Sequence, residues 1–90
     1  MTTEPLEIVR QPTPNPNAAK FTLNRMISTK GTTYRDAAAT DVEWARSLLQ
    51  IEGVSQVFAL NDFISIVKSQ ESDWNAIVPQ VERILEAAFV

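Results

Sequence analysis

The chain has 90 residues, a formal net charge of −3, and neither cysteine nor histidine. Its content of 44% apolar and 21% charged residues is ordinary for a folded globular protein, and the length predicts a single domain over residues 1–90. Without thiols or imidazoles, the chain has no disulfide, no thiolate site for a cluster or metal, and none of the commonest acid–base groups. We therefore expect no catalytic residues, no metal ligands and no cofactor.

Targeting and membrane signals are not evident in the sequence. No run approaches the roughly 20 apolar residues that a membrane-spanning helix needs. The first residues are acidic and lack the basic stretch and apolar core of a secretory signal. We therefore expect a cytoplasmic protein that does not enter membranes.

Residues 5–11 and 19–23 predict the first two strands. The first segment alternates loosely between apolar and polar residues, and the second alternates strictly. In the second segment, Phe21 and its apolar neighbours face the core, whereas Lys20 points outward.

A stiff loop is predicted between these strands. Its three prolines, at every second position of residues 12–16, cannot donate ladder hydrogen bonds and hold the preceding residues extended. Asn15 and Asn17 are the expected turn formers, because their side-chain amides bond nearby backbone.

Residues 24–36 are less regular, and only residues 32–35 predict a short edge strand. A helix follows, with a capping box from Thr40 to Glu43 at its start and Gly53 as a left-handed cap at its end. Its buried stripe is predicted to hold Val42, Ala45, Leu48 and Leu49.

Residues 54–60 and 63–68 predict a β-hairpin, because a two-residue polar link, Asn61-Asp62, joins two β-rich runs. Pairing of Leu60 with Phe63 divides the side chains between two faces. One face holds Val57, Ile64 and Ile66. The other face holds Phe58, Leu60, Phe63 and Val67.

The last helix is predicted to begin after Ser72 or Asp73, and apolar residues recur along it at helical spacing. Pro79 lies inside this pattern. It either kinks a helix that starts at Asp73 or is the first residue of the main helix.

The predicted order is ββ(β)–α–ββ–α, which indicates an α+β two-layer sandwich. A small, mostly antiparallel sheet carries two helices on one face. The second face of such a sheet stays open to water or to a partner. If the hairpin register is right, the helices cannot bury both Phe58 and Phe63, and one of these rings is a candidate binding residue.

Charge is distributed unevenly along the chain. Residues 8–35 contain five basic residues and no acidic one, whereas acidic residues predominate in residues 36–90. The cations are either ordinary solvated side chains or a surface that orients a charged partner. Nucleic-acid binding is not expected, because the isoelectric point near 4.8 lies far below that of such domains.

Enzyme chemistry is not expected either. A serine triad lacks its histidine base, and pairs such as Asp41 with Glu43 belong to helix termini or helix surfaces. Two glycines do not build a phosphate-binding loop.

Several separated blocks resemble the N-terminal domain of NifU-like (Nfu) iron–sulfur cluster scaffold proteins. Residues 13–17 followed by Lys20-Phe21 are similar to the T-P-N-P-N-x-x-K-F signature of that family. Other blocks agree in order and spacing. They are Ile51-Glu52-Gly53-Val54, Val57-Phe58, Asp62-Phe63-Ile64, Val67-Lys68 and Asp73-Trp74.

The resemblance implies a limited role. In that family a different, C-terminal domain with a C-x-x-C motif carries the cluster, and this sequence resembles a stand-alone N-terminal domain. The implied function is a non-catalytic accessory module that binds an iron–sulfur assembly or client protein without ligating a cluster. We expect the chain to be a monomer. The candidate partner-binding residues are Asn15, Pro16, Asn17, Lys20, Arg35, Phe58 and Phe63.

An alternative function stays open. The chain is then a small domain that binds a peptide or a phosphate anion and is unrelated to iron–sulfur chemistry. A peptide strand would add to an exposed sheet edge, and the basic segment at residues 8–35 would hold phosphate groups.

Overall fold

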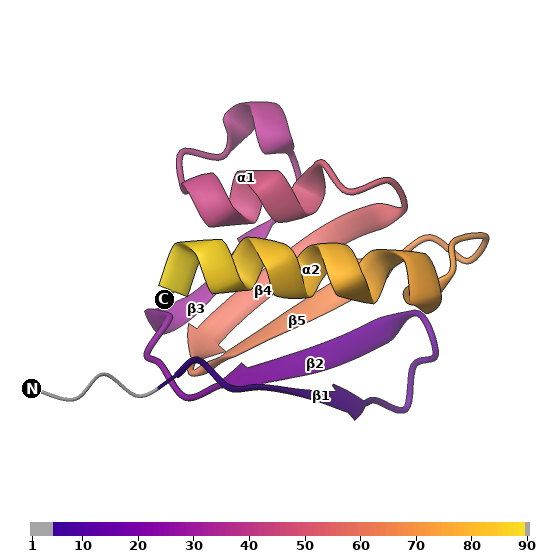
Figure 1. Ribbon diagram of the computed structural model, residues 1–90. Helices are drawn as coiled ribbons and strands as arrows, with labels where there is room; N and C mark the ends of the chain where they lie inside the picture. The colour runs from indigo at the N-terminus through magenta and orange to yellow at the C-terminus, as the bar shows by residue number, and fades with distance from the viewer. Residues whose placement is uncertain (1–4, 90) are drawn as a thin grey trace, which may run out of the picture.

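A computed structural model describes residues 5–89, which form one antiparallel sheet and two α-helices. The elements are β1 (Ile8–Pro12), β2 (Ala18–Leu23), β3 (Ser28–Tyr34), a 3-10 turn (Ala37–Ala39), α1 (Glu43–Leu49), β4 (Val54–Asn61), β5 (Phe63–Lys68) and α2 (Trp74–Phe89). The strand order is β1-β2-β5-β4-β3. Both helices lie on the same face of the sheet (Figure 1). The predicted α+β two-layer architecture is confirmed, and neither helix is long and apolar enough to span a bilayer.

The β4–β5 hairpin has the predicted register. Leu60 lies opposite Phe63, and the strands are antiparallel. Asn61 takes a φ of 54°, in the left-handed region that asparagine tolerates better than most residues. The tight turn therefore follows from the polar dipeptide that predicted it.

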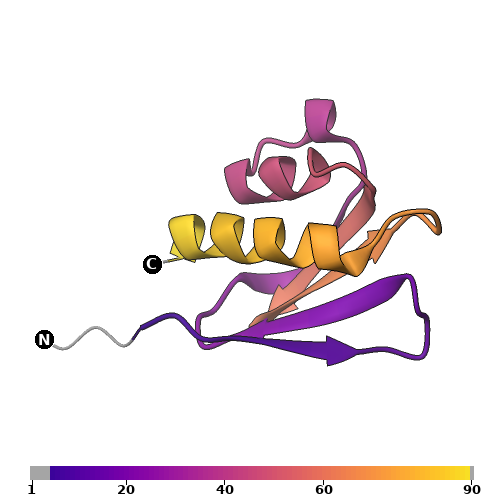
Figure 2. The ribbon, with the colours of Figure 1, turned by 45° about the vertical axis from the view of Figure 1, so that its right-hand side comes forward.

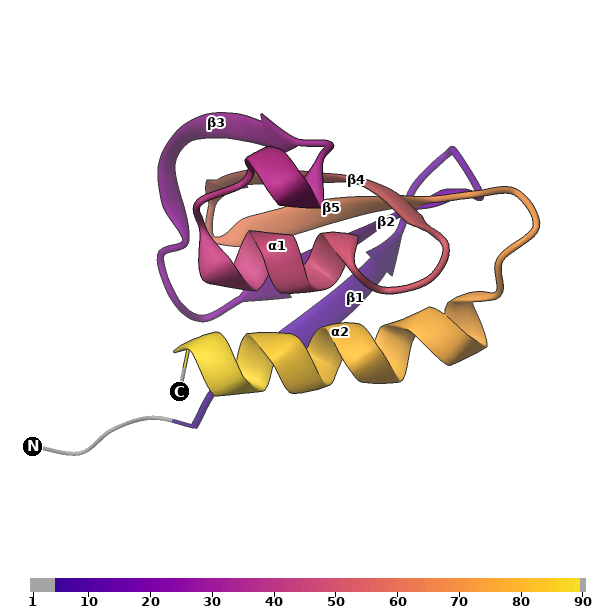
Figure 3. The ribbon, with the colours of Figure 1, turned by 90° about the horizontal axis from the view of Figure 1, so that it is seen from above.

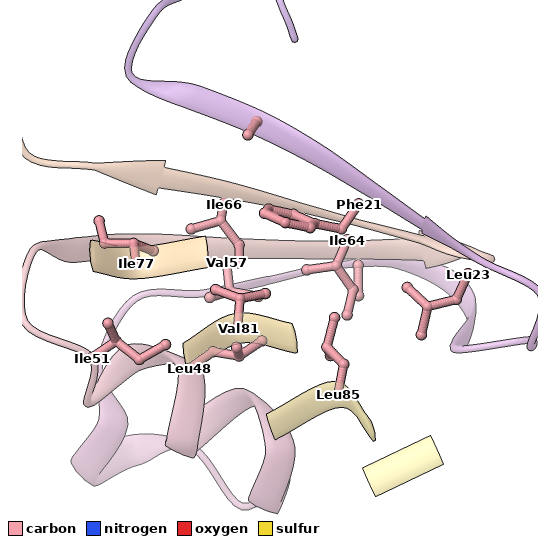
Figure 4. Packing of buried hydrophobic residues seen from close by; sticks show 12 residues of the cluster. Phe21, Leu23, Leu48, Ile51, Val57, Ile64, Ile66, Ile77, Val81 and Leu85 are labelled. Carbon is pink, nitrogen blue, oxygen red and sulfur yellow. The ribbon is translucent and has the colours of Figure 1, made fainter. Parts of the chain in front are cut away.

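The core lies between the sheet and the helices (Figure 4). The sheet contributes apolar side chains from every second position, and α2 contributes them at intervals of four residues, as expected for the two periodicities. The largest fully buried side chains are Phe21, Leu48, Ile64, Ile66, Ile77, Leu85, Val57 and Val81. The predicted inward face of the hairpin and the stripe of α2 are thus confirmed, although Ala88, whose helical spacing predicts it as the last residue of that stripe, is exposed.

The two outer strands differ in length from the prediction. β1 begins only at Ile8, although Leu6 also packs against the core. β3 is an edge strand, as predicted, but it already begins at Ser28. Its register against β4 shifts between Ser28 and Thr32, and this irregularity hides the strand from a search for strict alternation.

The predicted capping box at the start of α1 is wrong. The helix begins at Glu43, and its N-cap Val42 makes no side-chain cap hydrogen bond. The Thr40 hydroxyl instead donates to the Asp36 carbonyl oxygen at 2.6 Å. The residue is thereby committed to closing the 3-10 turn, which the sequence pattern did not reveal.

The predicted cap at the end of α1 is also wrong in part. Gln50 is the C-cap, and Gly53 lies in the following turn, where the Val54 N–H donates to the Ile51 carbonyl oxygen at 3.1 Å. Gly53 does have the expected positive φ, 98°. A Cβ atom at this position would collide with the Ser72 Oγ, so the site requires glycine for space as well as for conformation.

The second helix α2 runs from Trp74 to Phe89 through Pro79 without interruption (Figure 3). The Asp73 carboxylate accepts a hydrogen bond from the Asn75 N–H at 2.9 Å, which confirms Asp73 as the capping residue. The alternative in which the main helix begins at Pro79 is wrong. The first turn is already held by this cap and by the Ile77 N–H, which donates to the Asp73 carbonyl oxygen.

Candidate functional site

The sheet face opposite the helices carries no helix in the described part of the chain (Figure 2). We call it the open face. The strand register aligns its outward side chains in two rows across the sheet. One row is Val9, Thr22, Phe63 and Leu60. The neighbouring row is Gln11, Lys20, Ser65, Phe58 and Thr33.

Three of the predicted binding residues meet at the centre of the open face. The ring centroids of Phe58 and Phe63 lie 6.2 Å apart with planes tilted by 43°. The Lys20 Nζ lies 4.4 Å from the centroid of the Phe63 ring. Both rings are half-buried. The ring of Phe58 also lies against the backbone of β3, since a Cβ on Gly31 would approach its Cζ to 3.1 Å.

A fourth predicted residue, Arg35, reaches this face from its β3–β4 side. Its Nε donates to the Gln56 Oε1 at 3.1 Å. Gln56 precedes Phe58 by two residues on β4, so both side chains point to the same face. The register shift of β4 lies between Val54 and Gln56 and does not separate these two residues. Gln56 lies opposite Val67, one row from Phe58 and two rows from Phe63, so Arg35 reaches the open face at its β3 edge.

The loop of residues 13–17 uses its predicted binding groups within the chain. The Asn15 Oδ1 accepts from the Asn17 N–H at 2.9 Å, which is the turn-forming role expected of asparagine. The Asn17 Oδ1 accepts from the Lys68 Nζ at 3.1 Å. The Pro16 carbonyl oxygen accepts from the Trp74 Nε1 at 2.9 Å. The loop is therefore fastened to β5 and α2.

Lys68 and Trp74 anchor this loop, and neither is among the binding residues that the sequence predicts. Lys68 is only 8% exposed, and its Nζ also donates to the Ser69 carbonyl oxygen at 3.3 Å. The Lys68 Nζ lies 5.8 Å from the centroid of the Trp74 ring. The guanidinium carbon of Arg10 lies 5.7 Å from the same centroid. The signal was present in the alternation of β5, which places residue 68 on the same inward face as Ile64 and Ile66.

The candidate residues thus form two groups on opposite sides of the sheet. Asn15, Pro16 and Asn17 belong to the loop that binds the helix side through Lys68 and Trp74. Lys20, Arg35, Phe58 and Phe63 share the open face. The structure shows where these residues lie, and their role in binding a partner stays a prediction.

Charge separates by layer as well as along the chain. The sheet and its strand connections, residues 8–35 and 54–68, contain one acidic residue, Asp62. They contain six basic residues: Arg10, Lys20, Arg25, Lys30, Arg35 and Lys68. The helix layer, residues 36–53 and 69–89, contains eight acidic and two basic residues. The sheet layer is therefore positive and the helix layer negative.

Hollows in the described region lie between the helices, near the start of α2 and at the end of β3, where Thr33, Arg35 and Asp36 line one of about 410 Å³. A groove of about 410 Å³ between α1 and α2 is lined by Trp44, Ile84 and small residues of α2. A smaller one of about 260 Å³ lies near the start of α2, between Glu52 and Gln80. Within residues 5–89 no three carboxylates gather in a way that would hold a metal ion.

The fold and its residues define a member of a known family of scaffold domains. Residues 8–90 match the family described as the N terminal of scaffold protein Nfu/NifU. The chain therefore belongs to the Nfu/NifU N-terminal family, which is related to iron–sulfur cluster assembly. The resemblance seen in the sequence blocks is confirmed.

Similar proteins include longer chains. Conserved virulence factor C of Staphylococcus haemolyticus is 35% identical over 82 residues, which cover 89% of this chain and 22% of that protein. The corresponding protein of Staphylococcus aureus is 34% identical over 79 residues, 86% of this chain and 21% of that protein. This chain thus spans only about a fifth of the length of these curated relatives.

Solved structures support the same fold. The crystal structure of protein SAV1430 from Staphylococcus aureus has a TM-score of 0.80 at 30% identity, covering 89% of this chain and 99% of that one. The solution structure of a NifU-like protein from Saccharomyces cerevisiae has a TM-score of 0.83 at 27% identity, covering 97% and 82% of the two chains.

Proposed function

We propose that this chain is a non-catalytic accessory module that binds a protein of iron–sulfur cluster assembly or delivery and does not hold the cluster itself. The observation that carries the proposal is the family match over residues 8–90 in a chain without cysteine or histidine. Protein-bound clusters are held by cysteine thiolates, and in some cases by histidine. The cluster must then be carried by another domain or another protein.

A rigid, preorganised surface supports a binding role. The loop of residues 13–17 is fixed by its own turn and by its bonds to Lys68 and Trp74. The aromatic pair of the open face is set in the middle of the sheet, on strands β4 and β5. Elements that are already ordered lose little conformational entropy when a partner binds.

Calorimetric titration with purified cluster-scaffold proteins tests the proposal. Each scaffold protein is added in its cluster-free and its cluster-loaded form. We expect one of them to bind with a dissociation constant on the order of 10 μM or tighter. Absence of binding for every scaffold in both forms would contradict the proposal.

A parallel reconstitution tests the second half of the proposal. The chain alone is incubated with ferrous iron, sulfide and a thiol reductant, and then desalted. We expect no iron or sulfide to remain with the protein, because it offers no thiolate ligand. Stoichiometric retention of both would show that the chain holds a cluster.

A second candidate function is favoured by the basic sheet layer. In this interpretation the domain binds a peptide or a phosphate anion outside any iron–sulfur process. Titration of the labelled chain with inorganic phosphate and with an uncharged peptide distinguishes the two candidates, since the first requires a cluster-assembly protein and the second does not.

A further inference from the structure

We propose that the open face of the sheet is the docking surface for an acidic segment of a protein partner. Phe63 and Phe58 form its apolar centre, Lys20 supplies a positive charge over Phe63, and Arg35 adds a second at the β3 edge of the face. The inference deepens the proposed function, on which it rests for the partner's identity, by naming the surface used and the chemistry of the segment that binds there.

The apolar side chains of the open face are not part of the main core. The buried cluster and the side chains packed against it include neither Phe58 nor Phe63. These two rings contact each other on the far side of the sheet, and Val9 in the row of Phe63 is 54% exposed. Aromatic side chains at the centre of an uncovered surface are the residue type that contributes most to protein interfaces.

One cation lies over one of these rings, and a second is held at the β3 edge of the open face. The Lys20 Nζ lies over the Phe63 ring at 4.4 Å from the centroid, and Gln56 orients the Arg35 guanidinium through its Nε. A carboxylate that approaches the aromatic pair therefore meets a positive charge that is already placed. Such placement favours fast and specific association more than high affinity.

Charge selects an acidic partner. Within the described strands, none of the outward positions of the two rows, nor Ala18, Val67 or Gln56 beside them, is acidic. The single carboxylate of the sheet layer, Asp62, lies in the hairpin turn at its end. Acidic groups on a partner thus meet cations without facing a row of like charges, whereas a basic partner is repelled.

Two open faces do not complement each other in charge. A symmetric pairing sets one positive surface against another. Like charges in close contact across an interface oppose association. The partner therefore presents an acidic surface and not a second open face.

Nucleic acid fits the observations less well than a protein. Affinity for a nucleic acid rises with the number of phosphates that the protein neutralises. The open face offers two cations, and the chain as a whole carries a charge of −3. A short acidic segment with an apolar side chain matches an aromatic pair that has one cation over it and a second at the edge of the face.

Amide shift mapping with model ligands tests the surface directly. The isotope-labelled chain is titrated with a synthetic peptide of glutamate and leucine, a matched peptide of glutamine and leucine, and a single-stranded oligothymidine. We expect the glutamate peptide to shift amides of β2, β4 and β5 around Lys20, Phe58 and Phe63, with half-saturation on the order of 1 mM or tighter. The glutamine peptide should bind much more weakly.

Two charge reversals provide the matched variants. Lys20→Glu removes a cation from the open face, and Arg83→Glu removes an exposed cation from α2 in the other layer. We expect Lys20→Glu to weaken binding of the glutamate peptide about tenfold and Arg83→Glu to leave it unchanged. Thermal unfolding of each variant confirms that the fold is retained.

Several outcomes would overturn the inference. They are amide shifts confined to the helix layer, equal effects of the two charge reversals on peptide binding, no response up to the solubility limit, and tighter binding of oligothymidine than of the glutamate peptide.

The proposed function is judged separately, by the binding of cluster-scaffold proteins. A scaffold that binds Lys20→Glu as tightly as the parent chain defeats the surface and preserves the function. If the glutamate peptide binds the open face but no scaffold protein binds the chain, the surface is supported and the proposed function is contradicted.

Discussion

The two faces of the sheet are built from the same strands and have opposite surroundings. On one face, Phe21 and Ile64 are fully buried beneath the helices. On the other, Phe63 lies only partly covered, although it is adjacent to Ile64 in sequence and pairs with Thr22, the neighbour of Phe21. A strand turns successive side chains to opposite sides, so an apolar pair such as Phe63-Ile64 always supplies both faces. In this fold the two helices cover one face of the sheet and leave the apolar side chains of the other face without a helix over them.

The proline-rich loop shows the same contrast at the end of the sheet. Asn17 bonds a buried lysine of the covered face, whereas Lys20, three residues later, stacks on an aromatic ring of the open face. The two lysines near this loop therefore have different roles. Lys68 fastens the structure together, and Lys20 is presented outward.

The largest expected effect comes from truncating matching phenylalanines on the two faces. We expect Phe21→Ala to lower the free energy of unfolding by about 3–5 kcal/mol, because it leaves a cavity in the core. Phe63→Ala removes a half-buried ring from a face without a covering layer and should cost about 1 kcal/mol. Urea unfolding followed by circular dichroism measures both changes.

A similar loss for the two variants would contradict the distinction between the faces. It would mean that Phe63 contributes to folding as a core residue does. The open face would then need its aromatic pair for stability alone.

Much of this contrast could be predicted from the sequence, because it depends on local patterns. The Asn61-Asp62 link set the hairpin register, and the register assigned Phe58 and Phe63 to the face opposite Val57. The alternation of β5 also assigned residue 68 to the core side. Its identity points the other way, because a lysine at the end of a strand is ordinarily solvated.

What the sequence did not predict depends on contacts between distant residues. Thr40 and Glu43 have the spacing of a capping box, but the Thr40 hydroxyl is taken by Asp36 in a 3-10 turn. The bond from Lys68 to Asn17 joins residues 51 positions apart, and that from Trp74 to Pro16 joins residues 58 apart. Local propensity carries no information on such pairs, so the loop was predicted to present amides that the fold in fact uses.

An intermediate effect is expected at the two asparagines of the loop. Asn17→Ala removes an acceptor from the buried Lys68 Nζ and should cost about 1–3 kcal/mol. Asn15→Ala removes only the side-chain acceptor of an exposed turn and should cost roughly 0.5–1 kcal/mol. Chemical denaturation compares the two variants, and amide exchange of residues 13–18 reports on loosening of the loop. A larger loss for Asn15→Ala would contradict the anchoring role of Lys68.

The smallest effect on stability is expected for Lys20→Met, and it sharpens the comparison of the two lysines. The substitution keeps an apolar stem over Phe63 and loses only a cation–π contact, which is worth about 0.5–1 kcal/mol at exposed sites. Lys68→Met leaves the Asn17 Oδ1 without its donor and should cost more, about 1–3 kcal/mol. Denaturation curves of both variants, recorded at low and high salt, measure the difference.

If Lys20→Met destabilised the fold as much as Lys68→Met, the charge of Lys20 would serve the structure. A stable Lys20→Met variant that binds the glutamate peptide several-fold more weakly would instead assign that charge to a partner, because the substitution would then change binding without changing stability.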